Sequence, residues 1–160
     1  MKRIIVWMGM MVVSGAAAWA TPLELFNAQN LAEADWSWSD ARVRKQQATW
    51  VITEIHKQDT AGNVFVERRF PVHPDGEIAI NVQAVPRGAL TFQVLAFAGE
   101  TPIYTAEPLK NVTRPGRHVL NIRDLGLPPQ TQSLLFKLWV SEAEGASAVL
   151  DELRYYIPLF

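Results

Sequence analysis

The chain of 160 residues contains no cysteine, and its net charge is only −1. Without cysteine it has no disulfide framework, no thiolate metal site and no cysteine nucleophile. It also lacks the surplus of lysine and arginine that phosphate contacts require, which argues against a nucleic-acid partner. Disorder is excluded in turn, because 49% of the residues are hydrophobic, and this length is sufficient for one folded domain.

Residues 1–20 differ in character from the rest of the chain. A basic start is followed by an apolar run over residues 4–13 and by small residues that end in Ala18-Trp19-Ala20. These are the three regions of a secretory signal peptide, and the apolar run is shorter than the roughly 20 residues of a spanning helix. We therefore expect cleavage after Ala20 and an exported protein, periplasmic or extracellular, with a single domain over residues 21–160. An uncleaved N-terminal membrane anchor is the alternative.

Removal of this segment changes the composition. The whole chain has 15 Lys and Arg against 16 Asp and Glu, and cleavage removes Lys2 and Arg3, so the net charge becomes −3. All four methionines are lost with it, which leaves a domain without oxidisable sulfur, suited to an oxidising compartment. No later stretch approaches ~18 consecutive apolar residues, so we expect no membrane-spanning helix after cleavage.

Nine segments carry the period-2 alternation, or the β-branched and aromatic residues, that are typical of strands. In residues 133–140 the apolar side chains share one parity and Lys137 lies on the other. Residues 90–98 alternate in the same way. The remaining segments are 23–26, 49–55, 64–70, 77–82, 103–106, 118–122 and 148–157.

Turn sequences rich in glycine and proline separate these segments, as in Pro74-Asp75-Gly76, where proline presets φ and glycine accepts φ > 0. A helix is expected only near residues 27–35, and residues 125–131 are expected to form a loop. Many short strands joined by such turns predict an all-β fold, an antiparallel sandwich or barrel of about eight or nine strands.

Catalytic patterns are absent from the sequence. None of the three histidines, His56, His73 and His118, has a second ligand at a metal-like spacing, and there is no serine nucleophile elbow or phosphate-binding glycine loop. The carboxylates are scattered along the chain, whereas a glycosidase needs two of them facing each other across a cleft. We expect that the protein is not an enzyme.

Three aromatic residues are candidate ligand contacts. Trp36 and Trp38 are two residues apart in a polar stretch, so in an extended segment they share a face on which sugar rings can stack. The competing interpretation is that one or both cap the end of the core. Tyr156 is the third candidate, because Tyr155 and Tyr156 point to opposite faces of the last strand. Trp50 and Trp139 lie within strong strands, and we assign both to the core.

In the last predicted strand, Asp151 falls on the same side as the apolar residues Val149 and Leu153, because side chains alternate along a strand. If that face is buried, the carboxylate has to be hydrogen-bonded or coordinated, and oxygen-only Ca²⁺ coordination would satisfy it. Alternatively, Leu150 faces inward and a local twist places Asp151 outside.

The succession of strands from Trp50 to Tyr156 resembles the jelly-roll, galactose-binding-like β-sandwich of many carbohydrate-binding modules. The resemblance rests on segment 77–82, the strand that follows Gly88, the stretch from Leu109 into 118–122, and the closing strands. In that family an aspartate of the closing strand commonly binds a structural calcium together with an acidic residue of the first strand. Carried over here, the pair is Asp151 and Glu24.

Two functions follow from these observations. The first is a noncatalytic, exported carbohydrate-binding domain that stacks glycan on aromatic rings, with a possible structural calcium. The second is a structural or protein-interaction domain of the cell envelope without affinity for glycan. A β-sandwich hosts many functions, so the fold by itself does not decide between them.

Overall fold

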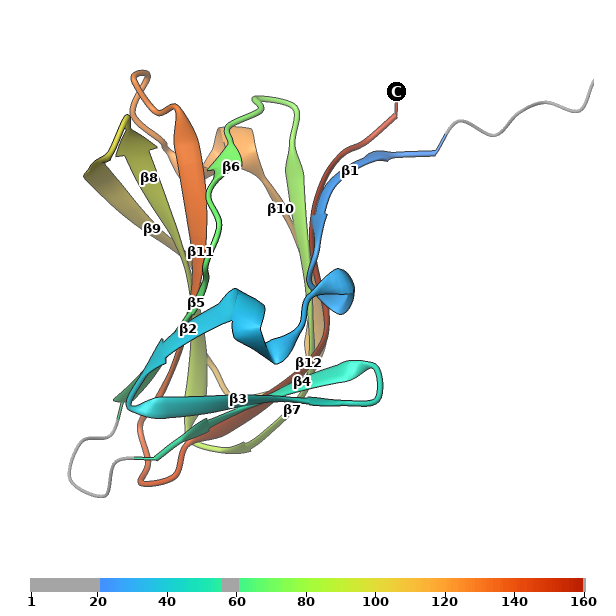
Figure 1. Cartoon of the computed structure of the whole chain (residues 1–160), viewed down its shortest axis with the longest axis vertical. Helices are drawn as coiled ribbons and strands as arrows, with labels where there is room; N and C mark the ends of the chain where they lie inside the picture. Colours follow the sequence, from blue (N-terminus) through green and yellow to red (C-terminus); the bar gives the residue numbers. More distant parts are fainter. Residues whose placement is uncertain (1–20, 56–60, 160) are drawn as a thin grey trace, which may run out of the picture.

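The computed structural model describes residues 21–55 and 61–159. The predicted signal peptide and His56 lie outside these residues. Two antiparallel β-sheets pack face to face and form the two layers seen in Figure 1. The predicted all-β sandwich is therefore confirmed. Among the described residues, no helical segment has the length and hydrophobicity to cross a membrane.

Each sheet has six strands within the described part of the chain. Sheet A has the order β10-β7-β12-β4-β3, and β1 pairs with β12 beside this path. Its strands are β1 (Leu23–Asn27), β3 (Ala41–Gln46), β4 (Thr49–Glu54), β7 (Glu77–Arg87), β10 (Gly116–Asn121) and β12 (Ser147–Ile157). Sheet B has the order β2-β5-β11-β8-β9, and β6 pairs with β11. Its strands are β2 (Trp36–Ser39), β5 (Ala61–Val66), β6 (Phe70–Pro71), β8 (Ala89–Ala98), β9 (Thr101–Val112) and β11 (Ser133–Ser141).

All nine predicted segments contain strands, and segment 64–70 contains parts of two, β5 and β6. The prediction of a helix near residues 27–35 is wrong. Two short 3₁₀ turns, η1 (Ala28–Asn30) and η2 (Glu33–Asp35), occupy this region instead, because the chain crosses here from β1 in sheet A to β2 in sheet B. A third 3₁₀ turn, η3 (Ile122–Leu125), precedes the expected loop.

The two strands that the sequence analysis missed, β2 and β3, lie at the edges of sheets B and A. The tight turn between them carries the chain from one sheet to the other, at the lower end of the sandwich in Figure 1. Ser39 pairs with Asn63 in sheet B, whereas Ala41 pairs with Glu54 in sheet A. Asp40, between them, has a φ of 56°, in the left-handed region that permits this change of direction.

Aromatic rings fill the core between the sheets. Phe136 on β11 stacks on Phe70 with ring centroids 5.0 Å apart, and it meets the ring of Tyr155 edge-on at 5.8 Å. The Tyr155 hydroxyl accepts a hydrogen bond from the His73 N–H at 2.8 Å and donates one to the Pro71 carbonyl at 3.2 Å. Burial raises the pKa of Tyr155. This buried hydroxyl therefore ties β12 to the segment around β6.

A β-bulge in β12 decides which way Asp151 points. The pairing of β12 with β7 shifts register between Leu150 and Glu152, and both Leu150 and Leu153 are buried. Leu150 and Leu153 both face inward, so the bulge leaves two residues between them, Asp151 and Glu152, on the outside of sheet A. The second interpretation of Asp151, with Leu150 facing inward, is therefore confirmed.

Candidate functional site

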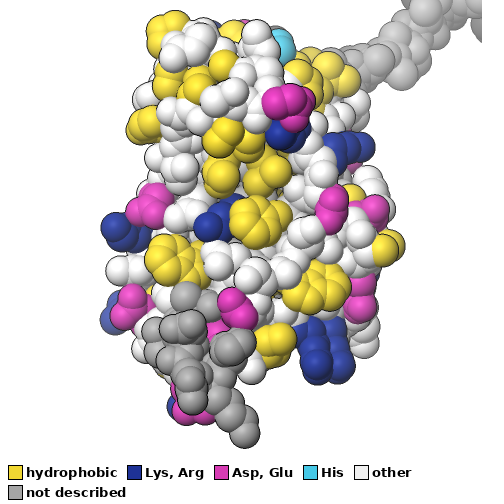
Figure 2. Space-filling model, turned by 60° about the vertical axis from the view of Figure 1, so that its left-hand side comes forward, with side chains coloured by type: hydrophobic (Ala, Val, Ile, Leu, Met, Phe, Trp, Pro, Cys, Tyr) yellow, Lys and Arg dark blue, Asp and Glu magenta, His cyan; other side chains and the backbone are white. Residues whose placement is uncertain are grey.

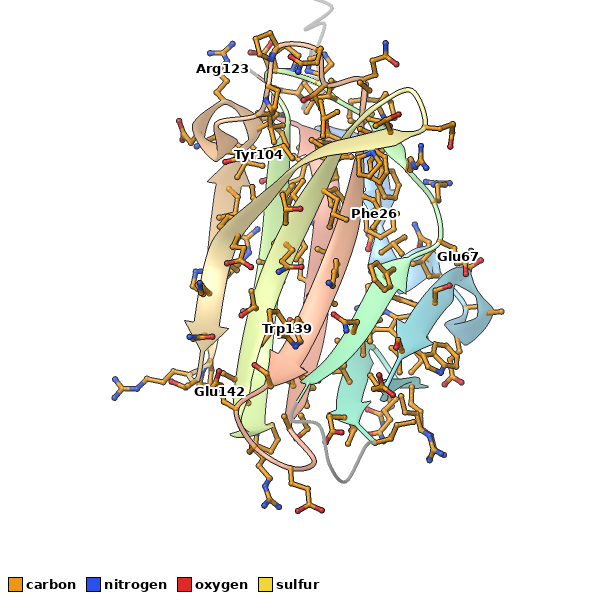
Figure 3. All side chains as sticks on the ribbon, turned by 90° about the vertical axis from the view of Figure 1, so that its left-hand side faces the viewer. Phe26, Glu67, Tyr104, Arg123, Trp139 and Glu142 are labelled. Carbon is orange, nitrogen blue, oxygen red and sulfur yellow. The ribbon has the colours of Figure 1, made fainter. Side chains whose placement is uncertain are left out.

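The outer face of sheet B combines aromatic and polar side chains. In β11 the inward residues are apolar and almost completely buried, and the alternate residues point away from the core. These outward residues are Ser133, Leu135, Lys137 and Trp139. Figure 3 views this sheet, with Trp139 lying over its middle. We refer below to this side of β2, β5, β11, β8 and β9 as the outer face of sheet B.

A row of side chains crosses this face from strand to strand. Lys137 on β11 lies opposite Phe65 of β5 on one side and opposite Gln93 of β8 on the other. Phe65 in turn lies opposite Ser37 of β2, and the Gln93 amide reaches Glu107 of β9. Because the row involves five strands, an extended ligand laid across the sheet would meet all of them.

Trp139 stands in the neighbouring row, opposite Asn63 of β5 and Thr91 of β8. The Lys137 Nζ lies 5.3 Å from the centroid of the Phe65 ring and 5.9 Å from that of Trp139. Lys137 therefore sits between two aromatic rings that face outward, in cation–π contact with both. Figure 2 shows how hydrophobic side chains alternate with charged and polar ones on this side of the molecule.

Hydrogen bonds fix the carboxylate of Glu107 at the margin of the face. Its Oε1 accepts a hydrogen bond from the Gln93 amide at 2.6 Å, and its Oε2 lies 3.3 Å from the Lys110 Nζ. The hydrogen bond from Gln93, followed by that from Lys110, lowers the pKa of Glu107. Both oxygens of this carboxylate are thus engaged within the chain.

Lys137 is partly desolvated by its surroundings. Burial lowers the pKa of Lys137, and the negative charge of Glu107 opposes this effect only in part. Thr91 and Gln93, although they point outward, are only 3% and 6% exposed. The middle of the face on β8 is therefore covered by neighbouring side chains of the protein.

The structure separates the two tryptophans of β2. They share a face, as predicted, because Trp36 and Trp38 lie opposite Val66 and Val64 of β5. That face is turned toward the core: Trp36 is 3% exposed and packs against Trp50 at 5.3 Å between ring centroids. Trp38 lies close to the crossing between the sheets and is 46% exposed. A stacking role is therefore sterically open to Trp38 and closed to Trp36.

Tyr156 lies on the opposite side of the molecule, on the outer face of sheet A. Its hydroxyl donates a hydrogen bond to Glu77 at 2.9 Å, and the Arg154 guanidinium lies 5.5 Å from its ring centroid. Burial, followed by the hydrogen bond with Glu77, raises the pKa of Tyr156. The structure therefore does not bring Tyr156 together with Trp36 and Trp38 in one site.

The predicted calcium ligands Asp151 and Glu24 are also separate. Glu24 pairs across from Tyr156, further along β12 than Asp151, and it accepts a hydrogen bond from Asn27 at 3.2 Å. Asp151 accepts a hydrogen bond from the Asn81 amide at 2.7 Å. Ca²⁺ requires six to eight oxygen ligands, and the described residues contain no group of three or more His, Cys, Asp or Glu placed to hold a metal. Calcium stays a prediction that the groups around Asp151 do not support.

Sequence analysis missed the residues that make up the outer face of sheet B. It assigned both Trp50 and Trp139 to the core, which holds for Trp50, at 2% exposed, and is wrong for Trp139. The signal was present in the alternation of β11, because Lys137 and Trp139 have the same parity, so a strand with Lys137 outside also has Trp139 outside. Phe65 carried no comparable signal in its short strand.

Comparison with known proteins identifies the fold. No family model matches the chain, and no curated protein sequence matches it. Among solved structures, an agarase named AgWH50C superposes with a TM-score of 0.59 at 10% identity, over 86% of this chain and 26% of the agarase. An exo-β-agarase gives 0.59 at 12% identity, over 86% of this chain and 25% of that one. The chain thus spans about a quarter of these proteins.

A shorter protein matches over nearly its whole length. A carbohydrate-binding module of family 29 superposes with a TM-score of 0.53 at 12% identity, over 86% of this chain and 88% of the module. At such low identity the likeness concerns the fold alone. The chain has the two-sheet, jelly-roll β-sandwich fold that is also found in carbohydrate-binding modules.

Proposed function

We propose that this protein is a noncatalytic, exported carbohydrate-binding domain whose glycan lies on the outer face of sheet B. The observation that carries the proposal is the arrangement of two outward aromatic rings, Phe65 and Trp139, around Lys137. Both rings are half-buried and point away from the core, and the apolar C–H faces of sugar rings stack on the accessible part of such rings. The proposed stacking tryptophan is therefore Trp139 on β11, which the sequence analysis assigned to the core, and not Trp36 or Trp38 on β2.

A polar group beside the rings supports the same function. The half-buried Asn63 of β5 lies opposite Trp139, and sugar hydroxyls need such a donor and acceptor next to an apolar stacking surface. The similarity of the fold to a family 29 carbohydrate-binding module adds weight, since that module is matched over most of its length.

The carboxylates at the margins of this face favour binding over catalysis. Glu107 is engaged by Gln93 and Lys110, and Glu67 accepts a hydrogen bond from the hydroxyl of Ser37. A glycosidase needs one carboxyl group to donate a proton and a second to act as nucleophile or base. Carboxylates that are fixed by hydrogen bonds and ion pairs within the chain are poorly suited to either role.

The test is affinity electrophoresis of the mature domain, residues 21–160, through gels that contain agarose, mannan, xylan, a pectin or a sulfated galactan. We expect retardation by at least one of these polysaccharides and a loss of at least about tenfold in affinity for Trp139→Ala, equivalent to about 1.4 kcal/mol. Trp38→Ala is the matched control, because it removes an exposed tryptophan from outside the proposed site, and it should bind like the wild type.

Migration unaffected by every polysaccharide, or equal retardation of wild type and Trp139→Ala, would contradict the proposal. A stable protein partner recovered from the native source, together with no affinity for glycan, would favour the envelope-interaction function instead.

A further inference from the structure

Lys137 has no ion-pair partner among the described residues, although the more distant charge of Glu107 attracts it. Among the described residues, no carboxylate lies within ion-pair distance of its Nζ, and no acceptor receives its hydrogen bonds. The nearest carboxylate in the row, Glu107, is already occupied by Gln93 and Lys110. Lys137 therefore presents three N–H donors on the proposed binding face with aromatic rings as their only described contacts.

Two other basic residues differ from Lys137 in this respect. Arg69, between β5 and β6, lies over the Phe97 ring, and its guanidinium also pairs with Glu100 at 3.0 Å. Lys110 is paired with Glu107. Lys137 is both the more central of these cations and the one that lacks a counter-ion within the described chain.

A partly desolvated ammonium without a counter-ion is unfavourable, and burial accordingly lowers the pKa of Lys137. An anionic group brought by a ligand would offset this cost and form charge-assisted hydrogen bonds, which are about twice as strong as neutral ones. The site therefore gains more from an anion than from a hydroxyl.

The spacing of the site suits a charged substituent on a sugar ring. Lys137 Nζ lies over both rings, 5.3 and 5.9 Å from their centroids, and so borders the surface on which a sugar would stack. A carboxylate or sulfate ester projects from the edge of a sugar ring, so a ring stacked on Phe65 or Trp139 can direct it at Nζ. A single cation without an ion-pair partner fits one such group, and the net charge of −3 after removal of residues 1–20 does not favour a densely charged polyanion.

We propose that Lys137 makes this face selective for glycans that carry an anionic substituent, a carboxylate or a sulfate ester, on the sugar stacked beside it. This inference rests on the proposed carbohydrate-binding function and specifies its substrate class.

The test compares each charged glycan with its own neutral form by calorimetry. One arm uses polygalacturonate oligosaccharides and the fully methyl-esterified form, and the other uses a sulfated galactan before and after desulfation. We expect the wild type to bind the charged member of at least one pair about tenfold or more tightly, with a preference that decreases as salt is added. The arm that shows the preference identifies the anion.

Three variants assign the preference to Lys137. Lys137→Gln removes the charge and should reduce affinity for the charged glycan to that for its neutral form, whereas Lys137→Arg should retain the preference. Arg44→Gln is the control for net charge, because Arg44 is an exposed residue of β3 in sheet A, and it should leave the preference unchanged. Thermal melting of each variant establishes that it is folded.

Two outcomes overturn the inference while leaving carbohydrate binding intact. In the first, the wild type binds charged and neutral members equally; in the second, Lys137→Gln keeps the preference. Failure of the underlying function is distinguishable, because then neither member of any pair binds.

Discussion

Trp50 on β4 points into the core of the sandwich, whereas Trp139 on β11 points away from it. Trp50 is 2% exposed and its Nε1 donates a hydrogen bond to the Ala28 carbonyl at 3.0 Å, whereas Trp139 faces outward and its buried Nε1 finds no partner in the described chain. Both residues lie in inner strands of their sheets. The same residue type therefore serves the core in one sheet and a surface in the other.

This difference predicts unequal effects on stability. Trp50→Ala should reduce the free energy of unfolding by about 3–5 kcal/mol, because it leaves a large cavity in the core. Trp139→Ala should reduce it by less, because the ring is only half-buried on the outside of the sheet and the variant loses no hydrogen bond. Urea denaturation of the two variants measures both values, and equal losses would show that Trp139 supports the core.

The two adjacent tyrosines form a second matched pair. Tyr155→Phe removes the hydroxyl that is hydrogen-bonded to the His73 N–H and the Pro71 carbonyl. These two backbone groups then lose a hydrogen-bond partner inside the protein. A loss of about 1–3 kcal/mol is expected. Tyr156→Phe removes a hydrogen bond to Glu77 near the surface and should cost about 0.5 kcal/mol or less. A larger loss for Tyr156→Phe in urea denaturation would contradict this assignment.

The ion pairs of sheet A predict a pH dependence of stability. Glu152 lies 2.7 Å from Arg117 and 2.6 Å from Arg154, and the hydrogen bond from Arg117 is the main cause of its lowered pKa. A carboxylate with a lowered pKa stabilises the fold above its unfolded pKa of about 4.3 and loses this contribution as the pH falls through the folded value.

Glu152→Gln should therefore lower the urea midpoint at pH 7, and lower it by less at pH 2.5, because the wild-type carboxylate takes up its proton as the pH falls. Glu100→Gln is a suitable control, because Glu100 pairs with Arg69 at an exposed position. An equal effect of Glu152→Gln at both pH values would mean that its charge does not contribute to stability.

The predicted export of the protein can be checked on the full chain. Expressed in a secreting host, it should be recovered outside the cytoplasm with Thr21 as its first residue, as measured by mass spectrometry of the N-terminal peptide. Ala20→Arg should block processing, because the cleavage pattern requires a small residue there. Recovery of wild-type protein that still begins near Met1 would contradict the cleavage prediction.

Much of the fold could be predicted from the sequence, because inner strands alternate strongly. In β11 the buried Leu134 and Phe136 alternate with the outward Lys137 and Trp139. Such alternation predicts a strand with one buried side, whichever strands it pairs with. β2 and β3 were missed because they are short edge strands with serine or arginine on their outward side. Such sequences resemble loops until a partner strand is known.

The candidate site was harder to predict, because it is assembled from five strands. Phe65, Lys137 and Gln93 lie far apart in the sequence and become neighbours only through the register of β5, β11 and β8. The spacing of Trp36 and Trp38 correctly indicated a shared face. It could not indicate that the face is the inner one, which depends on the pairing with Val64 and Val66.

The most direct test of carbohydrate binding by sheet B is NMR titration of the tryptophan indole groups. After removal of residues 1–20 the domain has four tryptophans, and each has one indole Nε1–H group. On addition of a bound glycan, the signal of Trp139 should shift progressively, and those of the core residues Trp36 and Trp50 and of Trp38 should stay in place. A shift of the Trp38 signal with no change at Trp139 would contradict the account.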